Sequence, residues 1–474
     1  MGLFQEFSES TSMHGLQRAV SSESKWKRPL WAALVLAGAC LATFNLSKTI
    51  KDFLHNPTTT ETSVHYSPDM EFPVVTICNL NPFSYGKLTG EMDFMAVIKN
   101  LVENGFTEED DIFEYMAQFQ RSRDVAITYS LKDLLIECQF DMMPCSADDF
   151  LTVPNYKYGD CFVFNKQIPE NFTHSNPRYT TKPGPDNGLI MKLDVQQMQY
   201  LYTTEDAGFK IVVHSQDTTA FPEDEGFLVM PGTRTNVGLK RTEMSRAPPP
   251  YSTCIGLADE YNVDMNVYSL TDGTRYSGEA CRKTCYIREV VRQCGCCDIL
   301  FVCPSEIYNT YEVNETNPYC NATNTDQFFC KKRVLNAFEK GELDCLGRCL
   351  PPCEEVVYDV ALSTALWPSE NWVFVPPGTS MQDAKNIINY YRENMLRVAI
   401  YFEDLTEKHV ESRPSYDWNR VLSDIGGQLG LWLGFSILTA MEWLELAYDA
   451  GIRAGTRKSQ GAQAAKVHVQ QQGQ

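Results

Sequence analysis

Apolar residues gather in two stretches of this 474-residue chain that are long enough to cross a bilayer. About 20 helical residues at roughly 1.5 Å each span the hydrocarbon core. The first stretch covers residues 30–50 and the second covers 421–449. They predict two transmembrane helices that flank a segment of roughly 370 residues.

The long segment between them mixes strand-like and helix-like patterns. A run rich in β-branched residues predicts extended chain over 64–80, and turn signals separate further strands over 185–270. A helix followed by a strand is predicted over 371–402. Apolar residues at helical spacing predict helices over 91–120 (interrupted at Asn104-Gly105), 278–300 and 325–343. The segment is therefore predicted to be a mixed α+β domain.

The second apolar stretch is a poor lipid anchor. It contains Gln428 and the acids Glu442 and Glu445, and ionisable groups inside a membrane cost several kcal/mol unless they face water or a partner. Its glycines are Gly426, Gly427, Gly430 and Gly434. Three of them recur every four residues, which leaves one helix face without side chains. The pattern predicts a helix that lines a path through the membrane.

Basic residues on the outer flanks of both stretches set the topology. They are Arg18, Lys25, Lys27 and Arg28 before the first stretch, and Arg453, Arg457, Lys458 and Lys466 after the second. The positive-inside rule then places both termini in the cytoplasm. A signal peptide is the alternative for the first stretch, but the stretch starts late and lacks a small-x-small cleavage site. The predicted parts are 1–29 and 450–474 inside, 30–50 and 421–449 in the membrane, and 51–420 outside.

Cysteines and glycosylation sequons agree with an extracellular segment. Of 17 cysteines, Cys40 lies in the first stretch and an even 16 lie in the long segment. The CGCC run at 294–297 and the CxxxC run at 281–285 also fit a zinc site, but disulfides are favoured in an oxidising compartment. Sequons stand at Asn171, Asn314 and Asn321, while a fourth at Asn45 falls inside the membrane stretch.

Charge and motif spacing exclude several function classes. The net charge of −20 argues against nucleic acid and favours cations near the surface. The seven histidines show no metal-ligand spacing, so no metal and no cofactor is expected. The acid run at 108–111 fits a cation site or, preferably, a solvated helix start. Gly434-Phe435-Ser436 continues into Ile437 rather than a second glycine, so it is not the nucleophile elbow of a hydrolase.

Nine motifs in order resemble the degenerin/epithelial sodium channel superfamily along almost the full chain. They are His14-Gly15, FPVVTICNLNPF at 72–83, YGDCFVFN at 158–165, Pro231-Gly232-Thr233, PPPYSTC at 248–254, Cys281-x3-Cys285-x8-CGC, Cys345-x3-Cys349-x3-Cys353, LSDIGGQLGLWLGFS at 422–436 and, within it, Gly434-x-Ser436. The resemblance implies a homotrimer whose subunits each carry two spans and an extracellular domain of palm, ball, finger, thumb and knuckle. ATP-gated purinergic channels share the two-span trimeric plan, but the Gly-x-Ser signature and the cysteine order point away from them. An adhesion or receptor protein has no use for Gly434, Glu442 and Glu445 within a span.

The resemblance also implies a disulfide set. The implied pairs are Cys78–Cys161, Cys138–Cys145, Cys254–Cys353, Cys281–Cys349, Cys285–Cys345, Cys294–Cys330 and Cys296–Cys320. Cys297 and Cys303 remain, and they most simply pair with each other, although spacing alone does not prove it.

Pore roles follow from the resemblance in the same way. Gly434, Phe435 and Ser436 match the family's selectivity signature, where a ring of carbonyls replaces part of an ion's hydration shell. His14 and Gly15 match a cytoplasmic re-entrant motif that supports this constriction. The implied gate and outer pore comprise Ser423, Asp424, Gly426, Gly427 and Gly430. Glu442 and Glu445 fit inner carboxylate rings or, alternatively, helix-packing or interfacial positions.

The resemblance implies an amiloride-blocked, sodium-selective channel of the plasma membrane. The sequences of its motifs look most like those of the invertebrate branch that includes FMRFamide-gated channels. The expected agonist is therefore a short amidated peptide. The predicted finger, residues 84–160, offers Phe94, Phe106, Phe113 and Tyr115 for such a peptide, or for packing its own core. Proton gating and constitutive or mechanical gating are the alternatives within the superfamily.

Overall fold

The computed structural model describes residues 3–22, 24, 26–91, 96–97, 99, 103, 109–123, 126–155, 157–167, 177–256, 264–310, 318–321, 324–369 and 380–452. It divides into two compact units. The first unit joins Met1–Thr59 with Arg413–Gln474, and the second is Thr60–Ser412.

The first unit is helical. Its elements are α1 (Leu3–Ser10), α2 (Leu16–Ser21), α3 (Lys27–Leu54), α13 (Trp418–Leu433) and a terminal helix, Ile437–Ile452. Among the described helices, α3 alone is long and apolar enough to cross a membrane, and α13 with the terminal helix passes the same test only as a pair bent by 74°. The predicted second span at 421–449 is therefore broken rather than continuous.

Close backbone packing holds α13 against α3. A Cβ atom added to Gly38 of α3 would lie 2.9 Å from the carbonyl oxygen of Trp432, so only glycine allows this approach. Elsewhere α3 exposes apolar side chains, including Leu36 and Phe44. An apolar surface of this kind suits contact with lipid.

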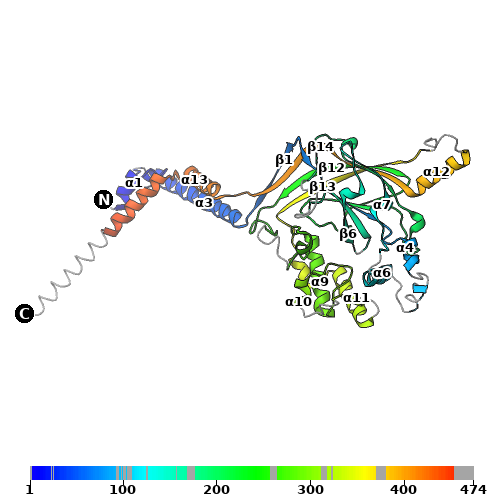
Figure 1. Ribbon diagram of the computed structural model, residues 1–474. Coiled ribbons are helices and arrows are strands. Elements are labelled where there is room, and N and C mark those ends of the chain that lie inside the picture. Colours follow the sequence, from blue (N-terminus) through cyan, green and yellow to red (C-terminus); the bar gives the residue numbers. More distant parts are fainter. Residues whose placement is uncertain are drawn as a thin grey trace, which may run out of the picture. The chain divides into compact units, whose positions relative to one another are not determined.

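The second unit contains a seven-stranded sheet and a five-stranded sheet (Figure 1). In the larger sheet the order is β13-β12-β14-β9-β4-β5, and β1 pairs with β14. Its strands are β1 (Thr58–Tyr66), β4 (Leu135–Phe140), β5 (Met143–Pro144), β9 (Leu189–Asp194), β12 (Thr233–Ser245), β13 (Glu354–Leu366) and β14 (Met395–Pro414). β12 and β14 run parallel, whereas β13 pairs antiparallel with β12. The parallel pair joins segments that are far apart in the sequence.

The smaller sheet supplies much of the core. Its order is β11-β10-β3-β7-β6, formed by β3 (Val74–Asn79), β6 (Phe150–Asn155), β7 (Gly159–Phe164), β10 (Phe209–His214) and β11 (Phe227–Val229). Every residue of β3 is buried, as expected for a β-branched run covered on both faces. β2 (Met70–Glu71) pairs with β8 (Tyr179–Thr180) as a separate ribbon. Buried side chains of both sheets form one core, in which Phe72 packs edge-on against Phe140 at 4.9 Å between ring centroids.

Short helices cluster beside the strands (Figure 1). They are α8 (Ser269–Asp272), α9 (Gly278–Cys294), α10 (Ser305–Thr310), α11 (Thr325–Glu339) and the 3-10 turn η5 (Asp344–Arg348). The sequence marks the ends of α9 locally, because Ser277 accepts a hydrogen bond from the backbone N–H of Ala280 and Gly295 adopts a left-handed conformation. Asn324 caps α11 in the same way. Gly295 explains why the pattern at 278–300 gives a helix that ends at Cys294. The pattern at 325–343 gives a helix that ends at Glu339, two residues before the left-handed Gly341.

Eight disulfides tie the second unit together, and they are the eight pairs expected above. They are Cys78–Cys161, Cys138–Cys145, Cys254–Cys353, Cys281–Cys349, Cys285–Cys345, Cys294–Cys330, Cys296–Cys320 and Cys297–Cys303. Two of them join α9 to the η5 segment and a third joins α9 to α11. The cysteine left unpaired in the described part of the chain is Cys40.

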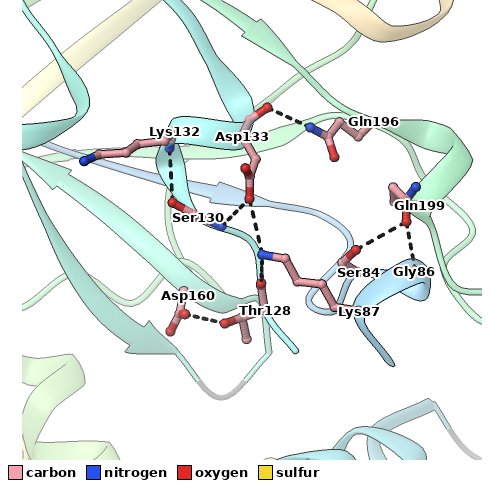
Figure 2. A network of polar contacts seen from close by, with 10 residues as sticks. All are labelled: Ser84, Gly86, Lys87, Thr128, Ser130, Lys132, Asp133, Asp160, Gln196 and Gln199. Atoms are coloured by element: carbon pink, nitrogen blue, oxygen red, sulfur yellow. Dashed lines mark hydrogen bonds and ion pairs between the residues drawn. The ribbon is translucent and has the colours of Figure 1, made fainter. Parts of the chain in front are cut away.

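A polar network fixes the base of the segment that leaves the core after β3 (Figure 2). The ammonium of Lys87 donates to the carbonyl of Thr128 at 2.9 Å and lies 3.2 Å from an oxygen of Asp133. Gln199 accepts from the backbone N–H of Gly86 at 2.8 Å. The outgoing and returning ends of residues 84–133 are thus held side by side.

The remaining elements complete the second unit. They are α4 (Tyr85–Glu91), α6 (Glu109–Arg123), α7 (Leu131–Leu134), α12 (Met381–Asn394) and the 3-10 turns η1 (Ala147–Asp149), η2 (Pro185–Asn187) and η3 (Gln197–Gln199). The helix predicted over 91–120 corresponds to α6 in its second half, and its predicted break at 104–105 lies outside the described residues. Within the run at 371–402, residues 371–379 lie outside the described residues, and the rest divides into α12 and the start of β14, as predicted.

Candidate functional site

The first part of the site is the end of α13. Gly434 has φ +64°, a left-handed conformation that ends a helix, and its N–H bonds the carbonyl of Gly430 at 3.0 Å. The N–H of Phe435 donates a hydrogen bond to the carbonyl of Leu429 at 3.2 Å. A left-handed glycine followed by a bond six residues back is a common way to terminate a helix. The sequence Gly-Phe therefore stops α13 at this point.

Ser436 starts the terminal helix. Its hydroxyl accepts from the backbone N–H of Thr439 at 3.2 Å, and its own N–H donates to the Thr439 hydroxyl at 3.1 Å. This reciprocal arrangement is a capping box with threonine in the fourth position. Within three residues, 434–436, the chain thus closes one helix and opens another in a new direction.

His14 fills the space beside the break. A Cβ on Gly434 would lie only 2.4 Å from Cγ of the His14 ring, so glycine is required for space as well as for conformation. The backbone N–H of His14 donates to the carbonyl of Leu433 at 3.1 Å. This carbonyl is one of those that the end of α13 leaves without a partner in the helix.

Gly15 and Arg18 hold the N-terminal segment against α3. Gly15 has φ +81°, and a Cβ there would lie 3.1 Å from a methyl of Val35 and 3.3 Å from the Trp31 ring. The guanidinium of Arg18 lies 4.9 Å from the centre of the same ring, close enough for a cation–π contact. His14 and Gly15 are therefore packed between α3 and the break.

Glu442 on the terminal helix is held by the N-terminal segment. Its carboxylate accepts from the hydroxyl of Thr11 at 2.8 Å and from the backbone N–H of Ser12 at 2.9 Å. The Ser12 hydroxyl also lies 2.7 Å from the fully buried hydroxyl of Thr439. Of the two roles considered for Glu442, an inner ring or a packing position, this chain's own contacts correspond to packing.

The remaining predicted pore residues are either exposed or half-buried in the single chain. Ser423 is exposed and donates to the carbonyl of Asn419 at 2.8 Å, Asp424 is half-buried, and Glu445 is exposed. A Cβ on Gly426 or Gly427 would meet nothing within 4 Å. Gly430 faces the break, where the nearest atom is the carbonyl oxygen of Phe435 at 3.9 Å.

Sequence reasoning missed Thr11, Ser12 and Thr439. The spacing of Ser436 and Thr439 is a capping signal that could have located the start of the terminal helix. The contacts of Thr11 and Ser12 join residues more than 400 positions apart, so no local pattern reports them.

The predicted peptide residues are only partly described. Phe94, Phe106 and the side chain of Phe113 lie outside the described residues, as do the side chains of the acid run 108–111. Tyr115 is half-buried and packs against a small core around Phe83, Leu88, Met116 and Ile127. Its position corresponds to the alternative, packing within its own segment.

Of the three sequons, only Asn321 is described. It is exposed and its side-chain oxygen accepts from Gln118 of α6 at 3.3 Å. Asn171 and Asn314 lie outside the described residues. Glycan attachment at all three therefore remains a prediction.

A buried charge cluster joins α6 to α11. The ammonium of Lys331 contacts the carboxylate of Glu114 and lies 3.4 Å from an oxygen of Asp298, and all three side chains are at most 5 % exposed. Asp298 also accepts from the hydroxyl of Tyr286 at 2.7 Å. Burial alone lowers the pKa of Lys331, but the two carboxylates outweigh it and raise the pKa above its ordinary value. Lys331 is therefore a charged buried anchor.

Comparison with known proteins covers nearly the whole chain. The family model described as amiloride-sensitive sodium channel matches residues 7–446. Human acid-sensing ion channel 2 is 28 % identical over 94 % of this chain and 86 % of its own, and the β subunit of the epithelial sodium channel from Neoceratodus forsteri is 25 % identical over 94 % and 82 %. Degenerin unc-8 of Caenorhabditis elegans is 31 % identical over 75 % of this chain, which spans only 44 % of that longer protein. A solved proton-activated chloride channel aligns with a TM-score of 0.34 at 6 % identity over 89 % of this chain and 96 % of its own, too weak a likeness to carry an argument.

Proposed function

The chain belongs to the amiloride-sensitive sodium channel family, and on this premise we propose that it forms a sodium-selective, amiloride-blocked homotrimeric channel of the plasma membrane. Its relatives are ion channels rather than enzymes. The observation that carries the proposal is the break at 434–436, where the chain ends one helix and starts another. A break of this kind brings backbone carbonyls and a serine to a constriction, where they can replace water around a small cation.

Assembly as a trimer is supported by the open glycine face of α13. A Cβ on Gly426 or Gly427 would meet nothing within 4 Å in the single chain, which leaves room for a neighbouring backbone. Three such helices around one axis would place three copies of Gly434, Phe435 and Ser436 at the same level. Ser423 and Asp424 would then lie towards the outer mouth, where three carboxylates concentrate cations.

The proposed topology has two spans and both termini in the cytoplasm. α3 forms the first span in lipid, and α13 with the terminal helix forms the second. In the N-terminal segment, Thr11 and Ser12 contact the terminal helix beyond the break, and His14 contacts the end of α13. It would support the constriction from the cytoplasmic side.

The experiment that tests the proposal is a current recording from cells that express this chain alone. We expect a current whose reversal potential follows external Na⁺ rather than K⁺ and which amiloride blocks. Gly451→Ala, near the end of the terminal helix, serves as the control and should keep the wild-type ratio, since its Cβ would meet nothing within 4 Å. An unaltered Na⁺/K⁺ ratio in Ser436→Cys channels that reach the surface would reject the constriction as the filter.

We further propose that a short amidated peptide opens the channel from outside, through the segment at 84–160. The support is that α6, within this segment, is anchored to α11 by Lys331, so a ligand that moves α6 moves the disulfide-tied helices with it. To convert a channel from 1 % to 99 % open, the peptide must favour the open state by about 5.5 kcal/mol.

Proton gating is the second candidate, and one observation favours it. Burial, together with the neighbouring carboxylates of Asp224 and Glu223, raises the pKa of Glu225 to about 7. An acid step followed by a panel of RFamide peptides separates the two. Peptide currents without an acid response support the first candidate, and a large acid current with no peptide response replaces it with the second.

A further inference from the structure

The register of the larger sheet gathers donor side chains from separate strands. β12 and β14 run parallel, with Arg241 opposite Glu407 and Glu243 opposite His409. Residues two apart on a strand point to the same face, so these four side chains share one surface. β1 pairs with the other edge of β14 and adds His65, whose ring centre lies 5.1 Å from that of His409.

The distances are those of a compact donor set. Nδ1 of His409 lies 3.3 Å from an oxygen of Glu243, and its Nε2 lies 3.5 Å from an oxygen of Glu407. One donor atom from each of the three residues lies within 4.8 Å of the other two. The three are half-buried and His65 is exposed. The donors are therefore held in place by the sheet yet reachable from solvent.

We propose that Glu243, Glu407 and His409 bind one divalent transition-metal ion, with Zn²⁺ as the representative, and that His65 supplies a fourth ligand. Zinc takes imidazole nitrogen and carboxylate oxygen at about 2.0–2.2 Å, which puts tetrahedral ligands about 3.4 Å apart. A single ion takes only one ring nitrogen of His409. Either imidazole–carboxylate distance alone has this length, and the third donor atom lies within 4.8 Å of the other two. Nitrogen donors favour zinc, copper or nickel over calcium or magnesium, which prefer oxygen alone.

Without an ion, Arg241 offsets part of the negative charge of Glu243 and Glu407. Its guanidinium contacts Glu407 and lies 3.7 Å from Glu243. Two carboxylates against one guanidinium leave a net negative charge for a cation. The ion would compete with Arg241 for both carboxylates, so the guanidinium weakens binding and keeps the site reversible.

The strands that carry the ligands connect directly to both predicted spans. β1 begins at Thr58, four residues after α3 ends, and β14 ends at Pro414, four residues before α13 begins. An ion shared by His65, Glu243 and His409 ties β1, β12 and β14 together. On the proposed channel function, this restraint should oppose opening and reduce the current.

Sequence spacing did not reveal this site. No two histidines stand at ligand spacing, and the donors come from positions 65, 243, 407 and 409 on three strands. The expectation that the chain binds no metal is therefore replaced by this proposal. Only the parallel pairing of β12 with β14 shows the donors together.

Zinc binding is tested first without reference to channel activity. The full-length protein, purified in detergent, is dialysed against ZnCl₂ with excess MgCl₂, and bound zinc per chain is measured by mass spectrometry. We expect one zinc ion whose affinity falls at least about tenfold in His409→Gln and Glu407→Gln, a loss that even outer-shell substitutions cause. His65→Gln should lose less, and the exposed histidine variant His55→Gln should match the wild type.

Two results would overturn the site. One is zinc stoichiometry and affinity in His409→Gln and Glu407→Gln equal to those of the wild type, which would place any bound zinc elsewhere. The other is no zinc bound by the wild type. Size-exclusion profiles identify variants that fail to fold, and Glu243→Gln then replaces them in the same comparison. Zinc that binds as expected but leaves the current unchanged would refute the effect on opening and retain the site.

Discussion

Replacing Lys331 by methionine keeps the alkyl stem but removes the charge that two buried carboxylates share. Glu114 is 4 % exposed and Asp298 is 3 % exposed. In the variant Asp298 keeps its hydrogen bond from the hydroxyl of Tyr286, while Glu114 loses its contact with the ammonium. Because both carboxylates are almost completely buried, the variant leaves their negative charge without the ammonium that balances it.

The expected cost is large enough to measure. Removing one partner of a buried ion pair costs about 3–5 kcal/mol. The second unit holds roughly 350 residues, and an unfolding entropy of about 2.1 cal/mol/K per residue gives roughly 0.7 kcal/mol/K. The apparent melting temperature of the unit should therefore fall by about 4–7 °C.

The assay is thermal unfolding of tagged full-length protein in detergent, with its disulfides intact. Lys340→Met, at the exposed C-terminal end of the same helix, is the matched control and should change stability by less than about 0.5 kcal/mol. The triple variant Lys331→Met, Glu114→Gln, Asp298→Asn should recover part of the loss, since it also removes the two buried negative charges. A Lys331→Met protein that melts with the control, or a triple variant that is no more stable than the single one, would refute the reasoning.

Further predictions concern the break at 434–436, the outer pore and the acidic residues 223–225. In Gly434→Ala the added methyl group would clash with the His14 ring, and the left-handed conformation would cost about 1–2 kcal/mol. The current should therefore be lost or its Na⁺/K⁺ ratio altered, which reversal potentials measure. Ser423→Phe should give persistent current without agonist, because packed helices absorb added volume only by moving; silent channels at normal surface density contradict this. The pKa of Glu225 is raised from 4.5 to about 7 by burial and by Asp224 and Glu223, so the folded state binds more protons and loses stability as pH rises between these values. In Glu225→Gln the melting temperature should fall less between pH 5 and pH 8, and an unchanged pH profile would remove Glu225 as the cause.

The sequence predicts those elements whose ends are determined by neighbouring residues. Helical spacing and the caps at Ser277 and Gly295 define α9 almost alone, and the apolar run predicts α3. The family assignment is confirmed by the match over 7–446. It rested on short motifs, many of which contain cysteines or glycines whose geometry tolerates few replacements.

Contacts between segments that are far apart in the sequence could not be predicted from local patterns. The parallel register of β12 and β14 joins residues more than 150 positions apart, and it alone places His409 beside Glu243. Lys331 is one of two adjacent lysines in α11, and its partner Glu114 lies on α6. Charged residues of this kind are read as solvated by default, and only tertiary packing shows which one is buried.

The break at 434–436 combines both kinds of cause. Gly434 and Ser436 are local signals that end and start helices, but local signals alone do not fix the direction of the terminal helix. That direction is set by Thr11 and Ser12 on Glu442 and by Phe7 against Trp443, with ring centroids 5.0 Å apart. If the break forms the filter, its geometry depends on the first 15 residues as much as on the signature itself. Changes in that segment should then alter ion selectivity, although none of its residues need line the pore.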